Sequence, residues 1–335
     1  IEQIKQQQDY LKTNLKINLR VTGLSNSRTM CFDEHGIDLQ DWKQKVKKGQ
    51  KASLSKFLEA AKEMNLRNSI FVDVTANKDV SDQYENYLKS SIAVVACNKI
   101  ACSSNYENYQ KLKSLSLEYN VPFLFETNVG AGLPVIDTLN NLIASGDKIT
   151  AIHAVLSGSL NYIFNHFDDT IKFHDVVKNA QGEGYTEPDP RIDLSGVDVA
   201  RKILILARES GSKLDLGNID NESFLTKSIL ESKSVDDFYR SLMNEEGHFQ
   251  ALYNSAKSNN SRLKYVAEFD NGNAKVGLKE IPVGHPFYNL EGKDNIVMFY
   301  TKRYPDQPMI IKGAGAGADV TASGIFADII RAEND

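Results

Sequence analysis

The chain has 335 residues, of which 41% are hydrophobic and 25% charged, and its formal net charge at pH 7 is -5. This length supports two hydrophobic cores, so we expect a globular protein of more than one domain. The acidic balance and the lack of a dense Lys/Arg block argue against a nucleic-acid-binding surface. The longest apolar stretches also fall short of the roughly 20 residues that span a bilayer.

The N-terminal part of the chain alternates between helical patterns and short apolar runs. The helical patterns cover 1–13, 54–64, 80–90 and 106–119. The apolar runs, read as strands, cover 17–24, 69–75, 92–97 and 121–126. Strands that alternate with helices of this length imply βαβ units and a parallel sheet, which is an outline typical of nucleotide-binding folds.

Beyond Gly132 the pattern changes to a mixed series that favours an α+β domain with its own sheet. Helices are predicted over 133–145, 160–167 and 197–207, and strands over 148–156, 276–281 and 295–300. The turn 313–319 then opens a last helix over 320–332. Its three glycines indicate a close approach to a ligand or to another backbone, and a purely structural turn is the alternative.

A Rossmann domain carries G-x-G-x-x-G after its first strand, and no such motif precedes Ile17. We therefore expect the chain as given to start just after that motif, which an upstream part of a longer protein would supply. If 17–23 is the second Rossmann strand, its end meets the adenosine ribose. Residues 25–28 stand there without an acid, and Arg28 can accept a 2′-phosphate, which favours NADP or dual use. A solvated loop arginine is the alternative.

Polar residues also follow other predicted strands at their carboxyl ends, where ligands collect in open α/β sheets. Thr75 and Lys99 stand at two such ends. Glu126 follows a third and precedes the glycine-rich turn 127–133, whose carbonyls could hold a cation beside the carboxylate. One acid with carbonyls suits a monovalent ion better than Ca²⁺ or Mg²⁺. The alternatives are a surface lysine at 99 and a helix cap at 126.

The segment 184–202 holds four carboxylates, two arginines and one lysine among two prolines and two glycines. Pro188 and Pro190 keep the residues before them, Glu187 and Asp189, extended. A helix over 197–207 follows, with Ser195 or Asp193 as its expected cap. Such a segment indicates a preorganised pocket that holds a cationic group with acids.

Asp198 and Lys202 are four residues apart on that helix and share one face. An exposed ion pair of this kind is worth only about 0.3–0.5 kcal/mol. The helix is apolar on most sides, however, so we expect it to be buried. Buried charges need partners, and a partly desolvated lysine is suited to proton transfer.

Other site types find little support. The six histidines show no paired metal spacing, and no G-x-S-x-G motif is present, which argues against zinc enzymes and serine hydrolases. Cys31, Cys97 and Cys102 are odd in number and lack C-x-x-C spacing. They predict reduced thiols and a cytoplasmic location.

Several motifs in this order resemble homoserine dehydrogenase, most closely the C-terminal dehydrogenase half of the bifunctional aspartokinase–homoserine dehydrogenases. These motifs are 128–134, 156–160, 184–202 and 313–322. The resemblance covers nearly the whole chain. It implies an α/β fold in which 1–129 and 314–335 form a Rossmann-type NAD(P)-binding domain without its first strand. Residues 130–313 would form an α+β catalytic and dimerisation domain.

The resemblance implies interconversion of L-homoserine and L-aspartate 4-semialdehyde with NADP or NAD, in threonine and methionine biosynthesis. Lys202 would be the general acid/base, with Lys99 near cofactor and substrate. Substrate binding would fall to Glu187, Asp193, Asp198, Tyr185, Thr186 and Ser159. The cofactor would meet Thr75, Lys99 and Gly315, besides Arg28. A sodium ion would be held by Glu126 and the carbonyls of Val129, Ala131 and Leu133.

Members of the family are usually homodimers through the second domain, or larger assemblies when fused to aspartokinase. Ile100 departs from the family pattern, since many relatives carry a second lysine there, which leaves Lys99 as the only lysine at that place. Because the phosphate-binding motif is missing, a non-catalytic binding or dimerisation fragment is the alternative function.

Overall fold

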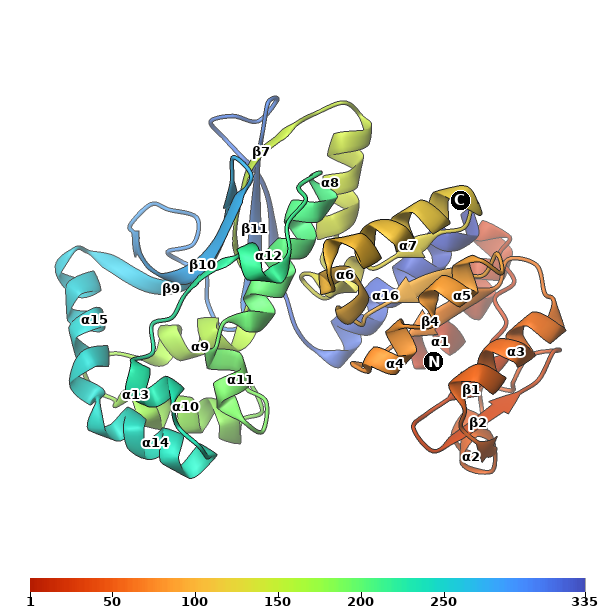
Figure 1. Ribbon diagram of the computed structural model, residues 1–335, viewed down its shortest axis with the longest axis horizontal. Coiled ribbons are helices and arrows are strands. Elements are labelled where there is room, and N and C mark those ends of the chain that lie inside the picture. Colours follow the sequence, from red (N-terminus) through yellow and green to blue (C-terminus); the bar gives the residue numbers. More distant parts are fainter. Residues whose placement is uncertain (335) are drawn as a thin grey trace. The chain divides into compact units, whose positions relative to one another are not determined.

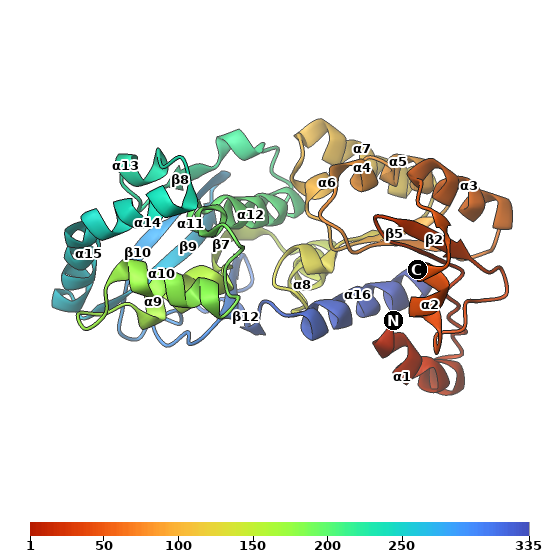
Figure 2. The ribbon, with the colours of Figure 1, turned by 90° about the horizontal axis from the view of Figure 1, so that it is seen from below.

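The computed structural model describes residues 1–334, and the chain divides into two compact units (Figures 1 and 2). Unit 1 consists of Ile1–Ala101, Glu107–Phe125 and the segment from Ala322 onwards. Unit 2 consists of Cys102–Tyr106 and Glu126–Thr321. Within the described residues, no helix is long and apolar enough to cross a membrane.

A three-stranded parallel sheet forms the centre of unit 1. Its order is β4 (Ile70–Asp73), β5 (Ala93–Ala96) and β6 (Phe123–Leu124). All four residues of β5 are buried, as a central parallel strand covered on both faces requires. The helices of this part are α3 (Leu54–Met64), α4 (Lys78–Ser81), α5 (Tyr84–Leu88), α6 (Ile100–Ser103), α7 (Tyr106–Glu118) and α16 (Ala318–Asn334).

The prediction of a strand over 17–24 in this parallel sheet is wrong. The extended segment is β1 (Gly23–Ser25), which pairs antiparallel with β2 (Thr29–Phe32) in a separate small sheet completed by β3 (Gln50–Lys51). Asn26 explains why this segment pairs with β2 and not with the parallel sheet, because its Oδ1 accepts hydrogen bonds from the main-chain N–H groups of Arg28 and Thr29. This side-chain-stabilised turn reverses the chain and gives β1 a local partner.

Short helical elements complete unit 1. The predicted N-terminal helix is α1 (Glu2–Tyr10), which continues as a π-helical turn over Leu11–Leu15. A further helix is α2 (Trp42–Lys47). The helix predicted over 80–90 is divided between α4 and α5, whereas α3 matches its predicted bounds.

Unit 2 is built on a six-stranded sheet whose order is β12-β11-β7-β9-β10-β8 (Figure 1). All neighbouring strands are antiparallel except β10 and β8. The strands are β7 (Ile149–Val155), β8 (Asp220–Glu222), β9 (Ser261–Asp270), β10 (Asn273–Pro282), β11 (Asp294–Thr301) and β12 (Met309–Ala314).

Helices cover one face of this sheet, with α9 and α12 directly against its strands. The helices are α8 (Val135–Ala144), α9 (Gly158–His166), α10 (Phe173–Gly182), α11 (Pro190–Leu194), α12 (Val197–Glu209), α13 (Lys227–Leu230), α14 (Val235–Asn244) and α15 (Glu246–Ser258), with 3₁₀ turns at Glu126–Asn128 and Leu216–Asn218. A small apolar cluster, including Phe287 and Leu290 of the β10–β11 connection, packs with Val266 and Met298 of the strands.

Candidate active site

A hydrogen-bonded hub at the carboxyl ends of β4 and β5 organises two loops of unit 1. Asp73 is buried, and its carboxylate accepts hydrogen bonds from Thr75 N (2.7 Å), Tyr84 Oη (2.6 Å) and Asn98 Nδ2 (3.0 Å). Asn98 also donates to Asn77 O (2.9 Å). The hub therefore ties the loop after β4 to the loop after β5, at the edge where open α/β sheets bind ligands.

Two predicted cofactor residues lie on these loops. Thr75 is exposed in the loop after β4, and Lys99 is half-buried in the loop after β5. Arg28 lies elsewhere in unit 1, in the β1–β2 turn. Asp73 was not among the predicted site residues, although an acid inside the apolar run 69–75 was a signal that could have found it.

Lys202 lies on the buried helix α12, whose burial confirms the prediction. Its Nζ lies 2.9 Å from Asp198 Oδ2 and donates to Leu156 O at 2.7 Å. The Lys202 side chain is only 12% exposed, whereas that of Asp198 is 45% exposed. The ion pair is therefore not the solvated pair of an exposed helix face, because the main chain after β7 also holds the ammonium group.

The predicted substrate residues Asp193, Ser159 and Glu187 come together in a second network. Ser159 Oγ donates to Asp193 Oδ1 (2.9 Å), and Glu187 N donates to Asp193 Oδ2 (2.8 Å). Ser157 Oγ lies 3.0 Å from Ser159 Oγ and accepts from the α9 main chain. Because residues 156–159 are consecutive, this network adjoins the carbonyl that holds Lys202.

Asp193 therefore does not cap α12, and that prediction is wrong. The cap position is Gly196, at φ +72°, with no side-chain hydrogen bond of its own. Ser195 Oγ accepts from Val197 N at 3.3 Å, just outside the cap position. A carboxylate committed to Ser159 and Glu187 is not available to the helix N-terminus.

The rest of the loop is held rigid by local contacts. Arg191 donates to both carboxylate oxygens of Asp189, and this hydrogen bonding lowers the pKa of Asp189. Asp189 is extended, as predicted from Pro190. Thr186 is buried beside the exposed Glu187, and the ring of Tyr185 stacks on Tyr162 at 4.1 Å between centroids.

The Glu126 carboxylate caps α8. Its two oxygens accept hydrogen bonds from Ile136 N (2.7 Å) and Asp137 N (2.8 Å), as the capping alternative expects. The turn that follows holds Gly130 at φ +81° and Ala131 at φ +54°. A left-handed alanine carries backbone strain, which is often stored at functional loops. Val129 and Leu133, the remaining predicted sodium-site residues, flank these two.

Gly315 lies in the glycine turn after β12. A Cβ atom at this position would come within 2.0 Å of Asn295 Cγ, so the close approach here is to a side chain of the same unit. Asn295 is completely buried, and neither its Nδ2 nor its Oδ1 has a hydrogen-bond partner within the described residues. Asn295 was not among the predicted site residues.

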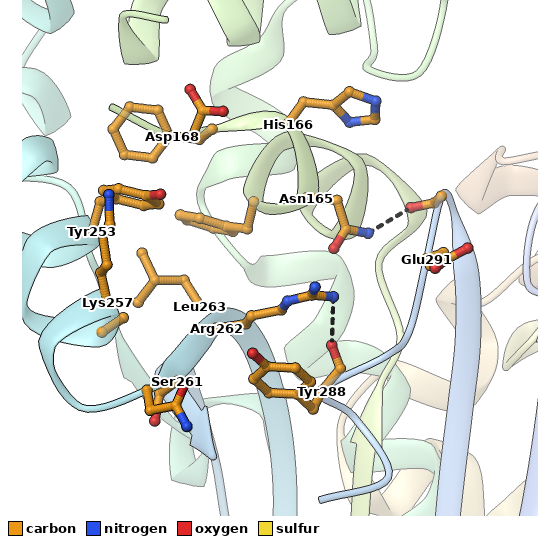
Figure 3. A pocket seen from close by; sticks show the side chains of 15 residues that line it. Asn165, His166, Asp168, Tyr253, Lys257, Ser261, Arg262, Leu263, Tyr288 and Glu291 are labelled. Carbon is orange, nitrogen blue, oxygen red and sulfur yellow. Dashed lines mark hydrogen bonds between the residues drawn. The ribbon is translucent and has the colours of Figure 1, made fainter. Parts of the chain in front are cut away.

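A cavity of about 540 Å³ lies elsewhere in unit 2, beyond the end of α9 (Figure 3). Arg262 crosses it, stacking on Tyr288 and donating to Tyr288 O at 3.2 Å. None of the predicted catalytic, substrate, cofactor or sodium residues lines this cavity. The arrangement around Lys202 is therefore the stronger candidate for chemistry.

Comparison with known proteins decides the family. The homoserine dehydrogenase family model matches residues 134–330, and the model for the homoserine dehydrogenase NAD-binding domain matches residues 1–126. This chain belongs to the homoserine dehydrogenase family. The fold is accordingly an NAD(P)-binding domain with a catalytic domain, as the sequence resemblance implied.

Individual relatives agree with this family. The chain is 35% identical to homoserine dehydrogenase of Schizosaccharomyces pombe, over 99% of this chain and 91% of that protein. It is 42% identical to bifunctional aspartokinase/homoserine dehydrogenase 2, chloroplastic, of Zea mays, of which it spans only 36%. A crystal structure of a Candida auris protein of unknown function superposes with a TM-score of 0.89, at 34% identity over 97% of this chain and 94% of that one.

Proposed function

We propose that this chain catalyses the NAD(P)-dependent interconversion of L-homoserine and L-aspartate 4-semialdehyde, a step toward threonine and methionine. The observation that carries the proposal is the Lys202 ammonium group, nearly buried and held by Asp198 and Leu156 O, beside the Ser159–Asp193–Glu187 network. Membership of the homoserine dehydrogenase family supports the choice of substrate.

The protein's own groups have distinct roles in this proposal. Lys202 takes the substrate hydroxyl proton during oxidation and returns it during reduction, as a general acid/base. Asp198 keeps the lysine oriented. The exposed Glu187 carboxylate receives the substrate ammonium group, while Asp193 fixes the Glu187 main chain. The nicotinamide cofactor, when bound, supplies the hydride chemistry.

Thr75 and Lys99 serve the cofactor in this proposal. The Asp73 hub supports the assignment, because it fixes both of their loops at a ligand-binding sheet edge. We propose NADP, or dual use of NADP and NAD, because Arg28 and its serine neighbours in the β1–β2 turn offer donors for a 2′-phosphate. The test is the ratio of kcat/KM for NADP and NAD, which Arg28→Ala should shift toward NAD.

The central experiment replaces Lys202 in the full-length protein. Lys202→Met should lower kcat for homoserine-dependent NADP reduction by about 10²- to 10⁴-fold, the range for loss of a general acid/base. NADPH affinity, measured by fluorescence titration, should change little. Lys227→Met is the matched control, because Lys227 forms the same i,i+4 pair with Glu231 on an exposed helix. Unchanged turnover in Lys202→Met would remove the lysine from proton transfer.

The same assays separate the dehydrogenase from the non-catalytic alternative. A wild-type protein that neither binds NADPH nor oxidises homoserine would support a binding or dimerisation module. Measurable homoserine oxidation that depends on Lys202 would show that the protein is more than a binding or dimerisation module.

We also propose a sodium ion at Glu126 and the carbonyls of Val129, Ala131 and Leu133. The strained turn at Ala131 supports a built loop, and the buried Glu126 carboxylate beside it supplies the negative charge that a cation site needs. Exchange of Na⁺ for a large organic cation should lower the melting temperature. Glu126→Gln should abolish that difference, and a melting temperature indifferent to the cation would refute the site.

For assembly, we propose a homodimer through unit 2 and fusion to an N-terminal aspartokinase. The exposed Ile310 on the edge strand β12 and the bifunctional maize relative support these proposals. Sedimentation of the full-length protein tests the homodimer. An assay for phosphorylation of aspartate by the same protein tests the fusion to an aspartokinase. The cytoplasmic location stays a prediction, since the maize relative is described as chloroplastic.

A further inference from the structure

Asn295 is a buried polar side chain without partners. It lies at the start of β11, is 0% exposed, and neither its amide nitrogen nor its oxygen forms a hydrogen bond within the described residues. Asn161 offers a contrast in the same unit. It is equally buried, but its amide donates to the β10–β11 connection and its oxygen accepts from Lys264. Buried amides are normally satisfied in this way, so Asn295 requires an explanation.

The glycine turn after β12 lies directly against Asn295. Asn295 pairs in register with Gly313, and Gly315 approaches its amide so closely that no Cβ would fit. Residues 313–318 of the turn are all glycine or alanine, and Gly317 adopts φ +130°. Ala314, Ala316 and Gly317 are exposed. Gly315 therefore faces the unsatisfied amide of Asn295, whereas Ala314, Ala316 and Gly317 face solvent.

Strand register also brings this turn to the Lys202 site. Ile296 pairs with Val155, so Asn295 lies opposite Leu156, whose carbonyl holds the Lys202 ammonium group. A hydride acceptor must contact the same substrate carbon whose hydroxyl Lys202 deprotonates. The start of the turn, Gly313, is two strand spacings from Leu156, or about 10 Å, with Asn295 between them. The turn has no bulky side chain, so it can admit the flat ring of a nicotinamide at this distance.

We propose that Asn295 is a positioning residue for the cofactor and that it acts through the glycine turn. This inference rests on the function proposed above. The amide has an NH₂ group that donates and an oxygen that accepts, and the peptide groups of the turn at Gly315 lie against it and are complementary to both. Binding of the nicotinamide end on the solvent side of the turn selects the turn conformation in which these bonds form. The bonds then contribute to cofactor affinity.

This role makes a prediction that a plain structural role does not. Asn295→Leu, close to Asn in size and without hydrogen-bonding groups, removes nothing that the cofactor-free protein uses. Its melting temperature without cofactor should equal or exceed that of wild type. Its dissociation constant for NADPH, measured by fluorescence titration of the full-length protein, should rise about tenfold, the effect of roughly one good hydrogen bond. The rise in melting temperature that NADPH causes should therefore be smaller for Asn295→Leu than for wild type.

Asn161→Leu is the matched control, because it removes an equally buried amide whose hydrogen bonds are already made. It should lower the melting temperature of the cofactor-free protein. If Asn295→Leu does not fold, Asn295→Ala is measured in its place, with the same weakening of NADPH binding expected.

The outcomes distinguish this inference from the proposed function. If wild type binds NADPH and the Asn295 variants bind it equally well, the inference is wrong and the dehydrogenase proposal stands. If Asn295→Leu destabilises the cofactor-free protein as much as Asn161→Leu does, Asn295 is merely structural and the inference is also wrong. If wild type itself binds no NADPH, both proposals fail together.

Discussion

Lys264 is a completely buried lysine on β9, and within the part of the chain that the structure describes its ammonium group is bound only by neutral oxygens. Its Nζ donates to Asn161 Oδ1 (2.9 Å), Asn165 Oδ1 (2.6 Å) and Leu290 O (2.6 Å). Burial lowers the pKa of Lys264 from its ordinary value of 10.5 to about 8, and the positive charge of Arg262 acts in the same direction. Lys264→Met, which removes the charge but fills much of the same space, should therefore change how stability depends on pH.

The direction follows from proton binding. Between pH 8 and 10.5 the unfolded chain keeps the Lys264 proton and the folded chain loses it, so the unfolded state binds more protons. The free energy of unfolding then rises with pH in this window. One pH unit between the two pKa values corresponds to about 1.4 kcal/mol. Wild type should thus gain about 3 kcal/mol relative to Lys264→Met from below pH 8 to above pH 10.5.

Urea unfolding followed by circular dichroism at several pH values measures this difference. Other groups titrate in the same range, but they do so in both proteins, so the comparison isolates Lys264. Lys227→Met, on an exposed helix, should run parallel to wild type. A difference between wild type and Lys264→Met that stays flat from pH 7 to 10 would refute the reasoning, because it would mean that the buried lysine keeps its ordinary pKa.

Two further substitutions test the packing and the network. Gly196→Ala should cost about 2–4 kcal/mol in urea unfolding, since its Cβ would lie 1.9 Å from Tyr265 Oη and its φ is +72°. Gly211→Ala, at φ +94° with open space, should cost only about 1 kcal/mol, and equal costs would contradict the packing argument. Asp193→Asn should lower kcat/KM for homoserine by about 10- to 100-fold, because it weakens charge-assisted bonds to Ser159 and the Glu187 main chain. Unchanged steady-state kinetics would show that the loop keeps its shape without that charge.

Elements whose pattern and local chemistry agree could be predicted from the sequence. The bounds of α3 match because its apolar periodicity, the Ser53 cap and a left-handed Asn65 all lie within the segment itself. The strand over 17–24 was mistaken because alternation indicates an extended chain but not its partner. The Asn26 turn, a local feature, gave β1 an antiparallel neighbour instead.

The candidate site was only partly predictable for the same reason. The Asp198–Lys202 pair follows from spacing on one helix, and the burial of that helix follows from its composition. The second partner of Lys202 is a main-chain carbonyl 46 residues away, which no side-chain pattern reveals. The Asp73 hub likewise joins two strand ends through tertiary contacts, although each strand end was recognised separately.

Lys264 shows the physical limit most clearly. Alternation along β9 places Lys264 and Val266 on one face of the sheet, and a lysine in such a pattern predicts a solvent-facing side. The β10–β11 connection covers that face instead, with Phe287 and Leu290 packed near Val266 and Leu290 O bound to the lysine. Alternation assigns a residue to a face but does not say what covers the face. Two of its acceptors lie on helix α9 and the third lies on the β10–β11 connection. Because a shift of β9 by one residue would move this ammonium group to the opposite face, away from all three, the buried lysine also penalises the wrong strand register.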